Sequence, residues 1–471
     1  MTHFAVIGAG ITGVTTAYAL LKRGYAVTVL DRHRYAAMET SFANGGQLSA
    51  SNAEVWNNAA TMLKGLRWMF RRDAPLLMNP APSWHKYSWL VEFAREITNY
   101  RDNTIATTRL AIAARQHLFA MAEQENIAFD HERRGILHIY HDKAGFDAGL
   151  RVNTLLREGG LDRRAVTPAE IRDIEPALQR SYHGGFFTPS DSTGDIHKFT
   201  RGLAAACMRR GARFVHEVQV DTITPVQGGY DIRWQQSSDN DVGAAQPLHV
   251  DGIVVCAGVG SRHIAAQLGE RVNVYPVKGY SITVHLDTAQ SRDAAPYVSL
   301  LDESAKIVTS RLGADRFRVA GTAEFNGFNR DIRADRIQPL TDWVQRNFPG
   351  VETARVVPWA GLRPMMPNMM PVVRSGTRPG VFYNTGHGHL GWTLSAATAE
   401  AIALAVESWR HAAVHTAMIT SRGTSELSTA KFGGTPALAP SPALAHNLPG
   451  AEQVPAPATE TTSEARRERC A

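Results

Sequence analysis

The stretch Phe4-Ala5-Val6-Ile7-Gly8-Ala9-Gly10-Ile11-Thr12-Gly13 determines the start of the fold. Its first four residues form a short apolar run, which is typical of a buried parallel strand. Residues 14–23 have a helical pattern that Gly24 ends, and residues 26–30 form a second apolar run before Asp31. Because strand, helix and strand occupy only about thirty residues, they predict a βαβ unit of a parallel sheet.

The three glycines of this unit each have a physical role. Gly8 allows a tight turn, Gly10 lets the backbone approach a pyrophosphate, and Gly13 permits close packing of helix on strand. The helix N-terminus offers free N–H groups to phosphates, and Asp31 stands where a carboxylate can accept hydrogen bonds from ribose. We therefore expect a Rossmann-like α/β domain that binds a dinucleotide. The expected contacts are Val6, Ile7, Gly8, Ala9, Gly10, Ile11, Thr12, Gly13, Asp31 and Arg32.

Composition narrows the class of protein. The 471 residues are 44% apolar and 20% charged, with a formal net charge of +6. This length allows about two to four domains, and the composition excludes a disordered or collagen-like chain. The small basic excess is spread along the chain, so we expect no nucleic-acid partner. No apolar stretch is long enough to span a bilayer, and the first apolar run is a strand and not a signal-peptide core, which predicts a cytoplasmic protein.

Cysteine content gives two further expectations. The three cysteines, Cys207, Cys256 and Cys470, are too few and too scattered for a disulfide framework. No pair of them has the spacing of metal ligands. We therefore expect a reducing compartment and no metal site.

Residues 36–52 have the composition of an irregular loop, with small polar residues around two adjacent glycines. A backbone of this kind can come close to a flat ligand. Ser41, Asn44, Gly45 and Gly46 are therefore candidate cofactor contacts, although an ordinary surface loop has the same pattern.

Four of the nine tryptophans lie between residues 54 and 100, and basic residues surround the second of them. These residues are Trp56, Trp68, Trp84 and Trp89, with Lys64, Arg67, Arg71 and Arg72. Aromatic and basic residues together are typical of an amphipathic segment at a membrane interface. Helices whose aromatic side chains pack in a core have the same composition, and we favour that interpretation.

The rest of the chain predicts a second sheet and a tail. Residues 218–220 and 251–258 are expected as strands that accompany the nucleotide-binding sheet. Residues 272–285, 305–309 and 316–322 alternate apolar with polar side chains, as antiparallel strands do. Beyond residue 415 an Ala/Thr/Ser-rich stretch with several prolines is expected to be disordered. The expected division is a discontinuous nucleotide-binding domain (1–55, 150–271 and 351–414), a mainly antiparallel α+β substrate domain (56–149 and 272–350) and a tail (415–471).

Four further motifs accompany the amino-terminal glycines in a fixed order. They are Ser41-x-x-Asn44-x-Gly46, Val274 to Ser281, Gly361-Leu362-Arg363-Pro364 and Asn384 to Thr393. Together these motifs closely resemble the small subunit of bacterial D-amino acid dehydrogenases, within the D-amino acid oxidase and glycine oxidase group of FAD enzymes. The similarity runs from about residue 4 to 415, and the tail has no counterpart in it.

The resemblance implies that the dinucleotide is FAD, with its adenosine end on Gly8 to Gly13 and Asp31. It implies a contact of adenine with Val218 or Val220, and a glycine turn at Ala257-Gly258 that closes over the cofactor. The pyrimidine end of the flavin is expected at Gly386, His387, Gly388 and Leu390, where N–H groups of a helix start stabilise negative charge. The side chains of His387 and His389 either take part directly in the chemistry or only pack and form hydrogen bonds locally.

The resemblance also implies the substrate contacts. Arg363 is expected to bind the substrate carboxylate through two parallel charge-assisted hydrogen bonds. The alternative is a structural arginine paired with an acid. Tyr280 is expected to add a hydroxyl to the same carboxylate, and Lys278 either orders water near the flavin or is an exposed strand residue. The turn Pro367-Asn368-Met369-Met370-Pro371 departs from the family pattern and, if it borders the pocket, makes it more apolar.

The activity that follows is oxidation of a D-amino acid by hydride transfer from Cα to flavin N5, with hydrolysis of the imine to a 2-oxo acid and ammonia. The resemblance implies a quinone-type electron acceptor and a peripheral contact with the inner face of the cell membrane. A D-hydroxyproline dehydrogenase, a glycine or sarcosine oxidase, and a non-catalytic FAD-binding subunit share the same motifs. The preferred substrate, the acceptor, the oligomeric state and covalent attachment of FAD stay open.

Overall fold

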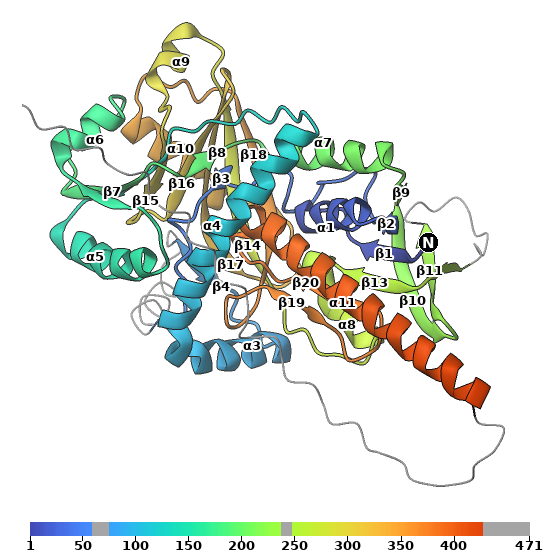
Figure 1. The fold of residues 1–471 in the computed structure, drawn as a ribbon. Helices are drawn as coiled ribbons and strands as arrows, with labels where there is room; N and C mark the ends of the chain where they lie inside the picture. Colours follow the sequence, from blue (N-terminus) through green and yellow to red (C-terminus); the bar gives the residue numbers. More distant parts are fainter. Residues whose placement is uncertain (59–74, 237–246, 427–471) are drawn as a thin grey trace, which may run out of the picture. The chain divides into compact units, whose positions relative to one another are not determined.

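The computed structural model describes residues 1–58, 75–236 and 247–426 (Figure 1). Within them, a six-stranded sheet has the order β19-β20-β13-β1-β2-β9. Its members are β1 (His3–Ile7), β2 (Ala26–Leu30), β9 (Arg213–Val215), β13 (Gly252–Val255), β19 (Val372–Ser375) and β20 (Val381–Thr385). All neighbours pair in parallel except β19 and β20. The expected βαβ unit is confirmed, with the helix α1 (Ile11–Lys22) between β1 and β2.

Side chains alternate between the two faces of β1, and each face is covered by different elements. Phe4 and Val6 pack in a core with α1, α7 (Ile196–Arg209) and α11 (Gly391–Glu426). Ala5 and Ile7 pack on the other face with α8 (Ser261–Gln267) and a small sheet. That sheet has the order β10-β11-β12 and consists of β10 (Val218–Val226), β11 (Gly229–Gln236) and β12 (Leu248–Val250). The parallel sheet is therefore buried on both faces, as a doubly wound fold requires.

The described residues also form a nine-stranded sheet of the order β18-β14-β17-β16-β15-β5-β7-β6, with β4 paired to β17. Antiparallel pairing of β14 (Tyr275–His285) with β17 (Arg316–Phe325) and β18 (Val356–Met365) confirms the antiparallel strands expected from residue 272 onward. A solvated face, which the alternation of apolar and polar residues also indicates, is not found at β14, because nearly all its residues on both faces are buried. The helix α10 (Ala334–Asn347) covers one face with Leu340 and Trp343. The other strands are β4 (Leu76–Met78), β5 (Ile136–Tyr140), β6 (Arg164–Val166), β7 (Gly184–Thr188), β15 (Ser299–Asp302) and β16 (Ile307–Leu312).

The division between the two sheets differs from the expected boundaries at residues 150 and 350. β6 and β7 pair with each other and with β5, and β18 pairs with β14, so all three belong to the nine-stranded sheet. These stretches were assigned to the nucleotide-binding domain. A short apolar run specifies a strand but not its partner, because the partner is set by hydrogen bonds to residues distant in sequence.

The carboxyl-terminal helix also differs from expectation. α11 continues to Glu426, whereas the disordered tail was expected from residue 415. The prolines that indicate disorder begin only at Pro436, and residues 415–426 contain no proline that would end a helix already formed from Gly391. The rest of the expected tail, 427–471, lies outside the described residues.

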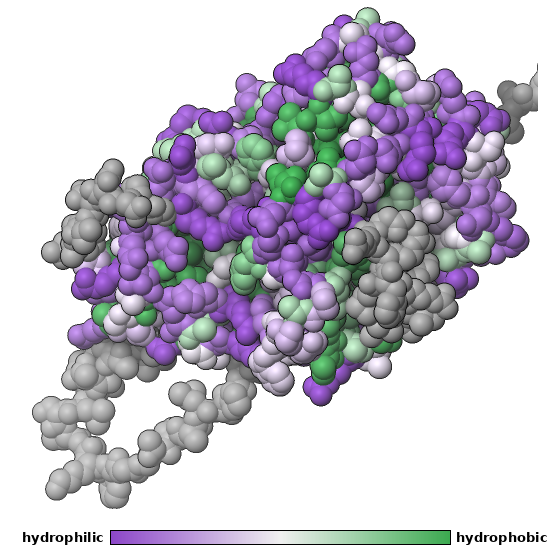
Figure 2. Space-filling model, turned by 180° about the vertical axis from the view of Figure 1, so that it is seen from behind, coloured by the Kyte–Doolittle hydropathy of each residue, from purple (hydrophilic) through white to green (hydrophobic). Residues whose placement is uncertain are grey.

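Other described elements complete the chain. They are β3 (Gln47–Leu48), β8 (Ser192–Thr193), α3 (Trp84–Arg95), η1 (Glu96–Asn99), α4 (Tyr100–Gln124), α5 (Lys143–Glu158), α6 (Pro168–Ile174), η2 (Gly258–Gly260) and α9 (Ala289–Ala294). None of the helices in the described part of the chain is both long and apolar enough to cross a bilayer. Figure 2 shows a face on which hydrophilic residues predominate and hydrophobic residues gather in smaller patches.

The tryptophan-rich segment is only partly described. Lys64, Arg67, Trp68, Arg71 and Arg72 lie outside the described residues. Trp89 is buried in a core with Phe93, and its Nε1–H donates to the Met365 carbonyl at 2.9 Å. In contrast, the side chain of Trp84 is 83% exposed. Trp89 therefore agrees with the interpretation of core packing, and Trp84 does not.

Candidate active site

A pocket of about 880 Å³ opens at the carboxyl ends of β1 and β2 and extends to the nine-stranded sheet. Its walls come from both sheets, from the loop at residues 39–56 and from the start of α11. Pockets in parallel α/β sheets form at this edge because the connecting loops diverge there. The site is built below from its nucleotide end to its substrate end.

The glycine-rich turn has the geometry of a pyrophosphate cradle. A Cβ on Gly13 would lie 1.8 Å from the Gly8 carbonyl oxygen, so helix and strand approach as closely as the sequence predicted. A Cβ on Gly10 would meet only the Ser41 Oγ, at 3.6 Å, which leaves its pocket side open. Gly10 caps α1 without a side-chain hydrogen bond. The Ile11 N–H donates to the Ser41 hydroxyl at 3.0 Å, whereas the N–H groups of Thr12 and Gly13 have no hydrogen-bond partner among the described residues and suit an anion.

Asp31 and two valines form the next part of the pocket. One carboxylate oxygen of Asp31 accepts the Ala9 N–H at 2.6 Å and the other accepts the His33 N–H at 2.9 Å. A carboxylate has about four acceptor positions, so it retains capacity for ribose hydroxyls. Val218 and Val220 line the same end with apolar surface. These residues fit the adenosine half of a dinucleotide.

Most residues that the sequence singled out line this pocket. They are Ile7, Gly8, Gly10, Ile11, Thr12, Asp31, Arg32, Ser41, Asn44, Gly45, Gly46, Val218, Val220, Ala257, Gly258, Tyr280, Arg363, Gly386, His387, Gly388 and Leu390. Val6, Ala9 and Gly13 are buried behind the wall and do not line it. These three residues shape the strand and turn from behind.

The loop with Gly45 and Gly46 also packs on the nine-stranded sheet. A Cβ on Gly45 would lie 2.7 Å from Val308 Cγ2, and one on Gly46 would lie 2.9 Å from the Ser310 side chain. The Ser310 hydroxyl donates to the Gly45 carbonyl at 2.7 Å, and Asn44 Oδ1 accepts the Gly46 N–H at 2.9 Å. Close approach to a protein strand therefore accounts for both glycines, in addition to their place on the pocket wall.

The turn before α11 presents backbone to the pocket. Gly386 and Gly388 have φ of +76° and +58°, and their added Cβ atoms would meet Met366 and Met365. The His387 side chain points inward, where Nε2 lies 2.9 Å from the Thr398 hydroxyl. Burial lowers the pKa of His387 to about 3, so the ring is neutral at pH 7. This geometry favours local packing of its side chain, while the first N–H groups of α11 lie beside the pocket.

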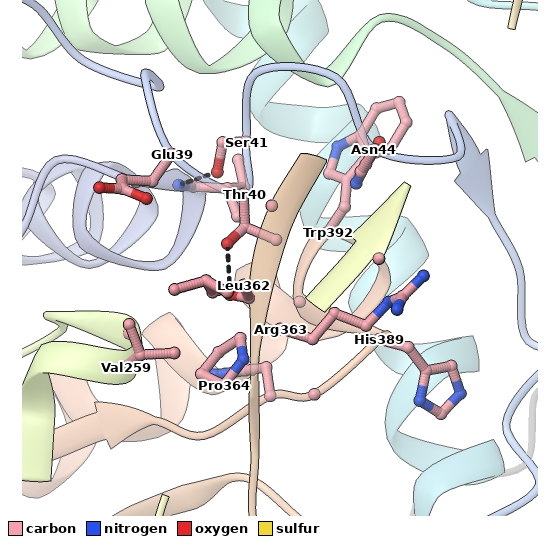
Figure 3. A pocket seen from close by; sticks show the side chains of 18 of the residues that line it. Glu39, Thr40, Ser41, Asn44, Val259, Leu362, Arg363, Pro364, His389 and Trp392 are labelled. Atoms are coloured by element: carbon pink, nitrogen blue, oxygen red, sulfur yellow. Dashed lines mark hydrogen bonds between the residues drawn. The ribbon is translucent and has the colours of Figure 1, made fainter. Parts of the chain in front are cut away.

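Arg363 is the central charge of the substrate end. Figure 3 shows the Leu362 and Arg363 side chains on opposite sides of β18. The guanidinium lies over Gly279, whose added Cβ would be 2.3 Å from it. Its Nη1 donates to the Thr322 carbonyl at 3.1 Å, and no carboxylate of the described residues pairs with it. Burial lowers the pKa of Arg363 to about 10, so it stays charged at pH 7.

Tyr280 faces away from Arg363, contrary to expectation. In the ladder of β14 with β18, Gly279 is paired with Gly361 and Tyr280 with Ala360, so Tyr280 lies on the other face. Its hydroxyl donates to Glu324 Oε2 at 2.7 Å, and its ring packs with Ile282. Successive residues of a strand point to opposite faces, so Tyr280 cannot lie beside Arg363 when Gly279 does. Tyr280 therefore does not contact the expected position of the substrate carboxylate.

The positions of Lys278 and of the turn at residues 367–371 also differ from those expected from the sequence. Lys278 is fully buried, and its Nζ donates to Asn329 Oδ1 at 2.6 Å, so it is neither exposed nor on the pocket wall. Met369 packs in a core with Val55 and Trp89 and does not line the pocket. The methionines of this turn therefore do not make the pocket more apolar.

Sequence reasoning missed one wall of the pocket. Asn52, Glu54 and Trp56 line it, whereas Ala53 and Val55 between them are buried in cores. The strict alternation of these five residues is a signal that could have been found. Trp56 stacks on His389, with ring centroids 4.9 Å apart and planes 23° apart. Burial lowers the pKa of His389 to about 4, and the charge of Arg363 contributes.

The sheet order and the glycine cradle define a class of proteins in which a Rossmann-like domain holds a dinucleotide against a second sheet. The family model of FAD-dependent oxidoreductases named DAO matches residues 3–405. The chain belongs to this family, and FAD is the cofactor that its cradle, carboxylate and open helix N-termini fit.

Relatives and solved structures agree with this assignment. The chain is 66% identical over 406 residues to "D-amino acid dehydrogenase 3" of Mesorhizobium japonicum, covering 86% of this chain and 97% of that relative. It is 40% identical over 409 residues to a D-amino acid dehydrogenase of Paramagnetospirillum magneticum, covering 84% and 93%. Glycine oxidase from Geobacillus kaustophilus has a similar fold, with a TM-score of 0.67, 19% identity and coverage of 87% and 95%.

Proposed function

We propose that this chain oxidises D-amino acids with FAD to 2-oxo acids and ammonia, and that Arg363 binds the substrate carboxylate. The observation that carries the proposal is a buried guanidinium that faces the pocket without a carboxylate partner in the described residues. A buried, unpaired charge is costly unless a ligand neutralises it. The names of the relatives at 66% and 40% identity supply the substrate class.

FAD, when bound, supplies the acceptor at N5 for the hydride that leaves Cα. The protein's contribution is positioning and electrostatics. Arg363 holds the substrate carboxylate so that Cα has one orientation. The N–H groups at the start of α11 would stabilise the negative charge at the pyrimidine end of the reduced flavin. Burial keeps His389 neutral, so this ring adds no positive charge to that of Arg363. Once the substrate amine is neutral its lone pair drives the hydride out, and no general base is required for that step.

An anaerobic visible spectrum with a panel of D- and L-amino acids tests the activity. We expect the flavin bands to bleach with D-isomers only. Arg363→Ala should retain FAD and raise KM by about 100-fold or more, because two charge-assisted hydrogen bonds are lost. Arg363→Lys should restore little, since an ammonium cannot form the bidentate pair. The control is Arg355→Ala, an exposed arginine paired with Asp287 at 3.0 Å.

Bands that survive every D-amino acid would contradict the proposal, as would unchanged saturation by substrate in Arg363→Ala. If sarcosine or D-hydroxyproline bleaches the flavin instead, the chain is a sarcosine-type oxidase or a D-hydroxyproline dehydrogenase. Formation of peroxide, measured in the same experiment, distinguishes the oxidase.

We propose further that electrons pass to a quinone-type acceptor at the inner face of the cell membrane. Support comes from α3, which contributes His85 to the pocket wall and exposes Trp84, Tyr87 and Val91. Side chains spaced by three and four residues share one helix face. An exposed aromatic and aliphatic stripe next to a redox pocket suits a lipid interface, where a quinone is available.

A further inference from the structure

Glu54 is an acid on the pocket wall with unused hydrogen-bonding capacity. Its Oε1 accepts the Tyr100 hydroxyl at 2.7 Å and the Asn58 Nδ2–H at 3.4 Å. Its Oε2 accepts no hydrogen bond from the described residues, and no arginine, lysine or histidine among them forms an ion pair with Glu54. Tyr100 therefore orients the carboxylate and leaves one oxygen available to a ligand.

The other acid nearby is already neutralised. Glu303 also lines the pocket, but its Oε2 accepts Lys306 Nζ at 2.6 Å and its Oε1 lies 3.0 Å from His138 Nδ1. Burial raises the pKa of Glu54, and the negative charge of Glu303 adds to this effect, while the hydrogen bond from Tyr100 and the charges of Lys306 and Arg163 oppose it. A cation placed at Glu54 would offset both contributions. Of these two acids, Glu303 is the one that forms ion pairs within the described residues, whereas Lys306 and Arg163 act on Glu54 only from beyond ion-pair distance.

Arg363 and Glu54 line the same pocket, and a stacked pair of aromatic rings connects their surroundings. The charge of Arg363 reaches His389, His389 stacks on Trp56, and Trp56 lines the pocket two residues after Glu54. His389 Nε2 also lies 3.2 Å from the Asn52 carbonyl oxygen, which fixes this wall. An α-ammonium stays within one carbon of the carboxylate that Arg363 binds. Only the end of a long side chain extends past the rings.

We propose that Glu54 and Trp56 form a side-chain subsite that selects D-amino acids ending in a cation, a primary ammonium or a guanidinium. The inference rests on the proposed oxidation of D-amino acids. Glu54 provides the charge and the free acceptor oxygen, and the indole of Trp56 provides an aromatic wall of the kind that attracts cations. Neutral side chains of equal length fill the same space without the ionic contact.

Paired substrates test the subsite on the FAD-loaded enzyme. D-Lysine and D-arginine are compared with D-norleucine and D-methionine, which have neutral side chains of similar length. In Glu54→Gln we expect kcat/KM for the cationic pair to fall by about tenfold or more, and for the neutral pair to change by less than about twofold. Glu54→Asp should lie between, and Glu158→Gln, which alters an exposed glutamate on α5, should behave as wild type.

A binding measurement separates this inference from the proposed function. 6-Aminohexanoate has the carboxylate and the terminal ammonium but no α-amine, so it binds without turnover, and hexanoate is its neutral match. We expect the oxidised flavin spectrum to report tighter binding of 6-aminohexanoate in wild type and equal binding of both in Glu54→Gln. Equal binding in wild type, or an equal loss for all four substrates in the variant, would overturn the subsite. Failure of every D-amino acid to bleach the flavin would count against the proposed function alone.

Discussion

Gly279 and Arg363 illustrate how a residue without a side chain can position one that carries charge. They lie on the same face of neighbouring strands β14 and β18, and the guanidinium occupies the space that a Cβ on Gly279 would need, 2.3 Å away. Heavy atoms cannot approach that closely, so any side chain at 279 must displace the guanidinium. Arg363 is thereby directed into the pocket by the glycine motif of the neighbouring strand.

Gly279→Ala should therefore raise the substrate KM by about tenfold or more while FAD content stays unchanged. The physical reason is a shift of the guanidinium from the carboxylate position. Steady-state kinetics and the ratio of flavin to protein absorbance measure the two quantities. Gly145→Ala is the matched control, since its Cβ on α5 would approach no atom closer than 3.3 Å. A normal KM in Gly279→Ala would show that Arg363 tolerates displacement.

At the scale of elements, the loop after β17 is tied to the loop after β2 across the pocket rim. Arg330 Nη1 donates to Glu39 Oε2 at 2.6 Å, and His33 and Arg32 contact the same carboxylate. Burial alone would raise the pKa of Glu39, but hydrogen bonds from His33 and Arg330 and the charge of Arg32 lower it to about 2. Phe328, on the same loop as Arg330, lines the pocket. The tie therefore holds part of the pocket wall in place.

The lowered pKa makes this tie dependent on pH. The folded pKa lies below the ordinary value of 4.5, so the carboxylate stabilises the fold above about pH 4.5. This stabilisation is lost as the pH falls through that value toward about 2. We expect Glu39→Gln to be less stable than wild type at pH 7 and to lose less of its stability between pH 5 and pH 3. Denaturant unfolding at both pH values measures this, and parallel losses in the two proteins would refute the assignment.

At the scale of the whole molecule, one helix connects the pocket to the solvent. α3 places His85 on the pocket wall, buries Trp89 and exposes Trp84, Tyr87 and Val91 on one face. The exposed fractions of these three side chains are 83%, 46% and 52%. Exposed aromatic residues at a helix surface favour the headgroup region of a bilayer. The same helix could thus bring the pocket to a lipid-dissolved acceptor.

The double variant Trp84→Ser, Tyr87→Ser should bind vesicles of mixed neutral and anionic phospholipid several-fold more weakly than wild type, because apolar surface is removed from the interface. Flotation with vesicles measures the bound fraction. Leu150→Ser, which alters an apolar residue on α5 about as exposed as Tyr87 (42% against 46%), should leave binding unchanged. Wild-type protein that stays at the bottom of the gradient would exclude this docking face.

Features that depend on residues close together in the sequence were predictable, and features that depend on distant residues were not. The βαβ unit was predictable because strand, turn and helix are encoded within about thirty residues. The order of the nine-stranded sheet was not, since β6, β7 and β18 are specified as strands locally but paired by distant residues. The end of α11 was also not predictable, because the proline-rich composition that begins at Pro436 was taken to apply from residue 415.

For the candidate site, the sequence by itself determined the glycine cradle, because a tight turn is a local feature, and Arg363 was predicted only through the family resemblance of its Gly-Leu-Arg-Pro motif. Tertiary structure decided that Tyr280 turns to Glu324 and that Gly45 packs against Val308. It also brought Glu54 to the wall of the pocket that Glu303, paired with Lys306, lines as well. Local patterns record periodicity and backbone conformation, whereas the partner of each face depends on strand register and on contacts between residues far apart in the chain.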